Sequence, residues 1–238
     1  MKYDVLNTRL PRVDARAKAT GDARYADDLS MSNMLYGAVL HSPLAHAKIL
    51  NIDTSEAKKL PGVKDIITAK EAGSIKFGVS PARYDETMFC VDKVRYVGDE
   101  VAAVAAVDYE TAQKALSMIK VDYEELPHYL SVFDAMEEGA VTIHDDHPNN
   151  ISAEVHNEFG DVEKAFAECD IIKVGTFSNK KQDGAFLEPQ ACLAHYDLNG
   201  NLTLYSSTQS VHYVQRTVAM VLNIPVGKVR VVKPYVGG

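Results

Sequence analysis

The sequence predicts an α/β (α+β) protein, because apolar runs of strand length alternate with segments whose apolar residues recur at helical spacing. The continuous apolar run from Glu100 to Val107 is typical of a strand that is buried on both faces. Asp108 follows this run and can cap a helix. The apolar face of that helix is formed by Ala112, Ala115, Leu116 and Ile119. Residues 120–123 then alternate as a second strand, so the first half contains a strand–helix–strand unit.

Further strands and helices are expected on both sides of this unit. Residues 35–40, 47–52 and 63–68 are rich in apolar and β-branched residues and predict strands, with a short helix between the last two. Residues 139–157 lack periodicity and contain a cluster of turn-forming residues, which predicts a linker. The elements expected beyond it are a helix capped by Asp161, strands at 171–177 and 191–196, a hairpin turn at 197–201, a strand at 202–206, a helix from about Val211 and a closing strand from Val229.

Composition and charge exclude several classes of protein. The net charge of −8 argues against nucleic acid as the main partner, because phosphate binding needs a concentrated basic face. No apolar run approaches the length of a membrane span, and the first residues lack the apolar core of a signal peptide. Cys90, Cys169 and Cys192 are far apart and odd in number, so they predict neither a disulfide framework nor a metal clip. We therefore expect a cytoplasmic protein with neither nucleic acid nor a membrane as partner.

One cluster, His144, Asp145, Asp146 and His147, is a candidate metal site, since imidazole and carboxylate groups bind divalent ions. Pro148 follows directly and indicates a loop, in which the spacing of the two histidines has no helical meaning. A solvated acidic turn is the preferred interpretation, and no metal ligand is predicted in this chain.

Glu188 directly precedes Pro189, and a proline holds the residue before it in an extended conformation. The carboxylate is therefore expected to be rigidly placed. Rigid placement suits a catalytic carboxylate, but equally a salt bridge or a hydrogen bond to a loop amide. The residue pattern favours the structural role and leaves the choice open.

Two further segments predict contact with a ligand. Ser207 and Thr208 lie between a strand and a helix and can serve as caps, whereas Gln209 is not a preferred cap and its amide can donate to a ligand oxygen. The closing strand leads into Gly237 and Gly238, and consecutive glycines allow a backbone to approach a ligand closely. A helix and a strand fill the interval between the two segments, so both can fold back onto one site.

Three segments in the first half carry a resemblance to a known family: Thr20–Leu29, Lys93–Val104 and Val121–Pro127. They resemble the α/β-hammerhead domain of aldehyde oxidases and xanthine dehydrogenases. The second half resembles the start of the molybdopterin-binding domain of the same family, where a glutamate-proline pair, a Ser-Thr-Gln run and a glycine loop follow in order. In this chain these motifs are Glu188-Pro189, Ser207-Thr208-Gln209 and Gly237-Gly238.

The residue pattern indicates an N-terminal arm at 1–15 and the linker at 139–157. The resemblance implies the hammerhead domain at 16–138 and the start of the molybdopterin-binding domain, truncated, at 158–238. It also implies that Gln209 hydrogen-bonds an oxo ligand of molybdenum and that Gly237 and Gly238 lie against the cofactor. In that family the metal is held by the dithiolene of the pterin. The resemblance also implies that the 2Fe-2S clusters and any FAD belong to other domains or partner subunits.

The implied function is that of a molybdenum hydroxylase acting on a small aromatic or heterocyclic molecule. The closing residues, Lys233 to Gly238, most resemble the 4-hydroxybenzoyl-CoA reductase branch of the family. Nicotinate, purine and aldehyde are the alternative substrates. The glutamate base of the family comes from a later part of a longer subunit, so no catalytic residue is expected in this chain. We expect the chain to need the remainder of that subunit, an iron–sulfur subunit and, where present, a flavin subunit. The alternatives are a non-catalytic module that uses the hammerhead domain for assembly, and a metal-dependent enzyme that uses His144 and His147.

Overall fold

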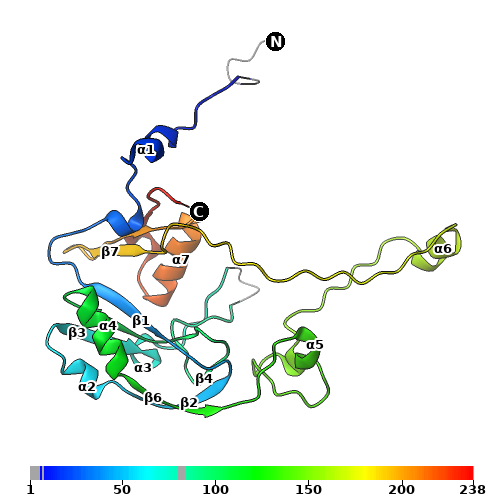
Figure 1. Cartoon of the computed structure of the whole chain (residues 1–238), viewed down its shortest axis with the longest axis horizontal. Helices are drawn as coiled ribbons and strands as arrows, with labels where there is room; N and C mark the ends of the chain where they lie inside the picture. The colour runs from blue at the N-terminus through cyan, green and yellow to red at the C-terminus, as the bar shows by residue number, and fades with distance from the viewer. Residues whose placement is uncertain (1–5, 7, 80–83, 238) are drawn as a thin grey trace. The chain divides into compact units, whose positions relative to one another are not determined.

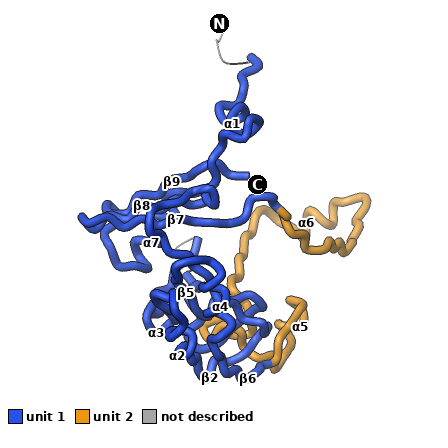
Figure 2. The backbone as a smooth tube through the Cα atoms, turned by 60° about the vertical axis from the view of Figure 1, so that its left-hand side comes forward, with its two compact units in different colours: residues 1–126, 186–238 blue, residues 127–185 orange. Residues whose placement is uncertain are grey.

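A computed structural model describes residue 6 and residues 8–79 and 84–237 of the 238-residue chain (Figure 1). By their contacts the residues divide into two units, one of residues 1–126 and 186–238 and one of residues 127–185 (Figure 2). Helices and small sheets are mixed along the chain, which confirms the predicted α/β (α+β) class. No helix in the described ranges is long and apolar enough to span a membrane. The two units do not follow the domain boundaries expected at 138 and 158, which stay a prediction.

The first sheet is antiparallel and has the order β1-β5-β3. It consists of β1 (Tyr36–His41), β5 (Glu100–Ala106) and β3 (Val63–Thr68). The strand predicted to be buried on both faces is β5, the central strand, as its position requires. Helix α4 (Tyr109–Met118) packs against β1 and β5. Small side chains let this helix approach the sheet closely, and the buried alanines of the core are Ala38, Ala57, Ala102, Ala106, Ala112 and Ala115.

The second sheet is also antiparallel, in the order β4-β2-β6. It consists of β4 (Lys93–Val94), β2 (Ala47–Asp53) and β6 (Lys120–Glu125). The predicted strand–helix–strand unit is confirmed as β5, α4 and β6, but its two strands belong to different sheets. Leu40, Ile52 and Val121 pack against the core clusters of both sheets. The two sheets therefore share one continuous core.

The third sheet has the order β7-β8-β9 and is the part that positions the candidate site. Strands β7 (Cys192–Tyr196) and β8 (Leu202–Ser206) form the predicted antiparallel hairpin. Helix α7 (Val211–Val221) then carries the chain to β9 (Val229–Val232), which runs parallel to β8. A small core of Leu202, Ala219 and Val229 lies between helix and sheet.

The hairpin turn has the chemistry expected of its sequence. The carboxylate of Asp197 accepts the backbone N–H groups of Asn199 and Asn201, each at 2.8 Å. Gly200 adopts a φ of 76°, which favours glycine. Aspartate and glycine together therefore fix the register of β7 against β8.

The unit of residues 127–185 contains α5 (Val132–Ala135), η3 (Pro148–Asn150) and α6 (Val162–Ala167). Asp161 caps α6 as predicted, accepting the N–H of Lys164 at 2.9 Å. The strand predicted at 171–177 is wrong, because no backbone hydrogen bond joins residues 170–190 to any described residue and a strand requires a partner. No residue of this unit is buried, so the unit has no hydrophobic core of its own.

The remaining helices are short: α1 (Ala15–Thr20), η1 (Ala26–Asp28), α2 (Ser55–Lys58), α3 (Ala69–Ala72) and η4 (Val226–Lys228).

Candidate functional site

One edge of the third sheet brings together the three motifs of the second half. Strand β7 is antiparallel to β8, and Cys192 at its start pairs with Ser206 at the end of β8. Strand β9 is parallel to β8, so its end lies at the same edge. The segment before β7, the loop after β8 and the segment after β9 therefore all leave the sheet at one edge. Glu188, Gln209 and Gly237 respectively belong to these three segments.

Glu188 and Gly237 are in direct contact. The backbone N–H of Gly237 donates to Oε2 of Glu188 at 2.5 Å. A β-carbon on Gly237 would lie 3.0 Å from Cβ of Glu188 and 3.3 Å from Cε1 of Tyr25, closer than side chains normally pack. Of the roles left open for Glu188, the structure contains the hydrogen bond to a loop amide. A side chain at position 237 would therefore require the neighbouring groups to shift by a few tenths of an ångström.

The segment after β9 is also fastened by residues near the N-terminus. The ammonium group of Lys18 donates to the carbonyl of Val236 at 2.9 Å. The N–H of Tyr235 donates to the carbonyl of Arg24 at 3.3 Å, and the ring of Tyr235 lies 6.4 Å from that of Tyr25 between centroids. The hammerhead-like segment at the N-terminus thus supports the glycine loop.

Sequence reasoning missed Lys18 and Tyr25 as part of this site. No periodicity or spacing marks them. Tyr25 does fall within the segment Thr20–Leu29 that carries the family resemblance, and this was the only signal that could have found it.

The loop after β8 uses its hydroxyl groups locally. The hydroxyl of Ser207 donates to the carbonyl of Ala191 at 3.2 Å and accepts the N–H of Ala191 at 3.3 Å, which ties the end of β8 to the start of β7. The N–H of Ser210 donates to Oγ1 of Thr208 at 3.1 Å. Ser210 precedes α7 as its N-cap residue, and its side chain makes no capping hydrogen bond. These bonds fix the backbone on both sides of Gln209.

Gln209 itself is exposed, and its side-chain amide makes no hydrogen bond within the described part of the chain. The structure places it at the same sheet edge as Glu188 and Gly237 but joins it to neither by a hydrogen bond. Gly238, the third predicted contact residue, lies outside the described residues. The amide of Gln209 therefore remains available to a ligand.

A cavity of about 310 Å³ opens beside the Glu188–Gly237 contact. Tyr25, Asp27 and Leu187 are among the residues that line it. Oε1 of Glu188 is buried and has no hydrogen-bond partner among the described residues. A buried carboxylate oxygen normally accepts a hydrogen bond, so this atom marks a place where a donor is missing.

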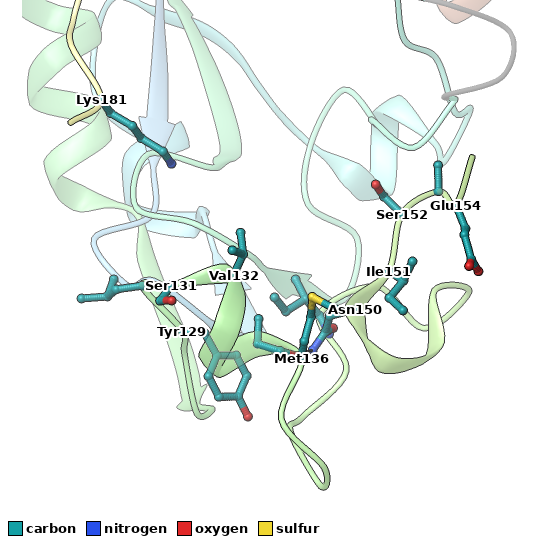
Figure 3. Close-up of a pocket in the computed structure, with 13 residues that line it drawn as sticks. Tyr129, Ser131, Val132, Met136, Asn150, Ile151, Ser152, Glu154 and Lys181 are labelled. Carbon is teal, nitrogen blue, oxygen red and sulfur yellow. Dashed lines mark hydrogen bonds between the residues drawn. The ribbon is translucent and has the colours of Figure 1, made fainter. Parts of the chain in front are cut away.

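A larger cavity, of about 680 Å³, lies in the unit of residues 127–185 (Figure 3). Its polar groups hold the surrounding loops together. Asn150 donates to the carbonyls of Ala135 and Val141 and accepts the N–H of Ile143, and Tyr129 accepts the N–H of Val141. These bonds engage the amide of Asn150 and use the hydroxyl of Tyr129 as an acceptor, so both side chains have a structural role.

Residues 144–147 form a turn, with the N–H of His147 donating to the carbonyl of His144 at 2.9 Å. The two imidazole rings lie 6.1 Å apart between centroids in an edge-on arrangement. Throughout the described ranges, no three His, Cys, Asp or Glu side chains are grouped so as to hold a metal ion.

Comparison with known proteins matches both halves of the chain. Residues 20–127 match the model of the aldehyde oxidase and xanthine dehydrogenase a/b hammerhead domain, and residues 143–238 match that of the molybdopterin cofactor-binding domain. The fold and site thus define a hammerhead domain followed by a molybdopterin cofactor-binding domain. The chain belongs to the aldehyde oxidase and xanthine dehydrogenase family and corresponds to the N-terminal part of its molybdopterin-binding subunit.

Two relatives illustrate the similarity. The chain is 38% identical over 237 residues to the nicotinate dehydrogenase large molybdopterin subunit of Eubacterium barkeri, an alignment that covers 99% of this chain and 55% of the relative. The crystal structure of quinoline 2-oxidoreductase from Pseudomonas putida 86 matches with a TM-score of 0.87 and 30% identity, over 97% of this chain and 30% of that one. The chain therefore spans about half the length of the first relative and less than a third of the second.

Proposed function

We propose that this chain forms part of the molybdenum-cofactor subunit of a molybdenum hydroxylase-type oxidoreductase, and that the edge of the third sheet faces the cofactor. The observation that carries the proposal is the close approach of Gly237 to Glu188 at the edge that also bears Gln209. Gly237 presents backbone without a side chain, and the amide of Gln209 at the same edge has no partner in the described chain. Such an edge is suited to a large polar ligand. The match of residues 143–238 to the molybdopterin cofactor-binding domain supports this identification of the ligand.

The residues at this edge offer two features to the cofactor. Oε1 of Glu188 is buried without a hydrogen-bond partner among the described residues, and the side-chain amide of Gln209 offers a donor to a ligand oxygen. The bound cofactor would supply two-electron redox chemistry. Gly237 and Gly238 would then lie along it, while Gln209 would donate a hydrogen bond and orient it. The protein groups thus bind and position, and no residue of this chain acts as the base.

For the substrate, we propose an aromatic nitrogen heterocycle. The relatives include enzymes named for nicotinate, xanthine and quinoline, which supports this class. The resemblance to the 4-hydroxybenzoyl-CoA reductase branch stays a prediction about the substrate, since no relative reported above carries that name. Assays of the assembled enzyme with nicotinate, hypoxanthine and 4-hydroxybenzoyl-CoA would separate these possibilities.

For the partners, we propose the remainder of the molybdopterin-binding subunit together with iron–sulfur and flavin subunits. The chain spans 55% of one relative that is itself named a large subunit, which supports a multi-subunit assembly. The unit of residues 127–185 has no buried residue and exposes Phe159, Val174 and Phe177 almost completely. Such side chains are expected to be covered by another polypeptide. The cytoplasmic location also stays a proposal.

The test is to coexpress the chain with a polypeptide that carries the rest of the family's molybdopterin-binding subunit and with an iron–sulfur subunit. The molybdenum content of the purified assembly is measured by mass spectrometry of the metal, and the pterin by the fluorescence of its oxidised form. We expect both in a ratio near one per chain. An assembly that forms but contains neither would support the alternative, a non-catalytic assembly module.

A further inference from the structure

Glu188 joins two segments that are far apart in sequence. Its carboxylate reaches the N–H of Gly237, 49 residues further along the chain. Pro189 restricts the backbone of Glu188 to an extended conformation, so the side chain starts from a fixed position. Ser207 and Ala191 close the same edge of the sheet a few residues away. Glu188 therefore extends from a conformationally restricted backbone toward the glycine loop.

The two oxygens of this carboxylate have different environments. Oε2 accepts the N–H of Gly237, whereas Oε1 is buried and has no partner in the described part of the chain. None of the described lysine, arginine or histidine side chains forms an ion pair with Glu188. Stabilisation of the Glu188 carboxylate therefore depends on N–H donors. A buried carboxylate oxygen without a donor costs free energy.

We propose, on the basis of the function proposed above, that Glu188 is the positioning residue of the cofactor loop: Oε2 fixes Gly237 and Oε1 accepts a second N–H donor. This donor is an N–H group of the pterin ring, which would donate to a charged acceptor. Glu188 acts through the loop and takes no part in the reaction itself.

The first arm of the test uses the 238-residue chain produced in a host that makes no molybdopterin. Backbone amide exchange at Gly237 is followed by nuclear magnetic resonance in the wild type, Glu188→Ala and Glu188→Gln. Glu188→Ala should speed exchange at Gly237 at least about tenfold, because a charge-assisted hydrogen bond is lost. Glu188→Gln should keep it within about threefold, because its amide oxygen can accept the same N–H.

Asp27→Ala is the matched control, because Asp27 is an exposed carboxylate that lines the same cavity. It removes the same charge without a hydrogen bond to the loop and should leave exchange at Gly237 unchanged. Unchanged exchange in Glu188→Ala as well would overturn the anchoring role. This arm is independent of the cofactor, so its outcome stands even if the proposed function fails.

The second arm tests whether Oε1 of Glu188 accepts a hydrogen bond from the pterin. The glutamine variant is informative, because its NH₂ group would face that donor and could not accept from it. If the pterin supplies it, Glu188→Gln should keep exchange at Gly237 within about threefold of the wild type but lower the pterin content of the coexpressed assembly severalfold. A wild-type pterin content in Glu188→Gln would show that Oε1 takes no donor from the pterin and would overturn this part of the proposal. A wild-type assembly without pterin would instead count against the proposed function.

Discussion

The ammonium group of Lys18 donates a hydrogen bond to the carbonyl of Val236, 2.9 Å away and 218 residues further along the chain. Lys18 also lies 3.2 Å from the carboxylate of Asp14, so its position is held from its own helix. The glycine loop is thus held by two side chains, Lys18 at Val236 and Glu188 at Gly237. The first residues of the chain therefore have a structural role at the candidate site.

Replacing Lys18 with Met should loosen the segment after β9. The methionine keeps most of the apolar stem but removes the donor to Val236, which should cost about 1 kcal/mol of unfolding free energy. Hydrogen exchange of the peptide that ends at Gly237 should become faster. Lys59→Met is the control, because within the described residues the ion pair of Lys59 is with exposed Glu56. Equal effects of the two substitutions would contradict the role of Lys18.

Gly237→Ala should displace the glycine loop. The new methyl group would lie 3.0 Å from Cβ of Glu188, so one of the two segments must move. The expected loss of unfolding free energy is about 1–3 kcal/mol, measured by denaturant titration. Gly227→Ala is the control, since a β-carbon there would meet nothing within 4 Å. If Gly237→Ala is as stable as Gly227→Ala, the close approach is not a constraint.

Alanine substitution of Gln209 and of Gln215 should affect the free energy of unfolding differently. The amide of Gln215 donates to the carbonyl of Val229 at 2.7 Å, so Gln215→Ala should lower the unfolding free energy by about 1 kcal/mol. Gln209 is exposed and has no hydrogen bond within the described residues, so Gln209→Ala should leave stability unchanged. In the coexpressed assembly, Gln209→Ala should lower the molybdenum content. Full molybdenum content in that variant would argue against a contact between Gln209 and the cofactor.

The helix cap at Asp108 should make stability depend on pH. The backbone N–H of Thr111, which donates to this carboxylate at 2.7 Å, lowers the pKa of Asp108. A lowered folded-state pKa contributes stability above the unfolded value of about 3.9 and loses it as the pH falls through the folded value. Asp108→Ala should therefore lower the thermal midpoint at pH 7, and the difference from the wild type should shrink below about pH 4. A difference that stays constant down to pH 2 would mean that the charge of Asp108 contributes nothing.

Much of the fold could be predicted from local sequence. The hairpin β7–β8 followed from the turn residues at 197–201, and β5 followed from a run of apolar residues that only a central strand requires. The strand predicted at 171–177 was wrong because alternation describes a single segment, whereas a strand exists only with a partner. The division of β5 and β6 between two sheets was also beyond a local pattern, since register and sheet membership depend on distant contacts.

The candidate site was predictable in part. Glu188 was marked by the proline that follows it, and Gly237 by the strand that leads into it, but their direct contact depends on the strand order of the third sheet. Lys18 carries no signal, because a lysine near the N-terminus is most often a solvated residue. A hydrogen bond across 218 residues is a property of the assembled fold alone.

The central claim is that the edge of the third sheet faces the molybdenum cofactor. The most direct measurement is a crystal structure of the coexpressed assembly, with anomalous diffraction recorded at the molybdenum absorption edge. The account predicts one anomalous peak next to the loops of Gln209 and Gly237, closer to them than to any other loop of this chain. A peak that lies against another face of the chain, or beside the cavity of residues 127–185, would contradict it.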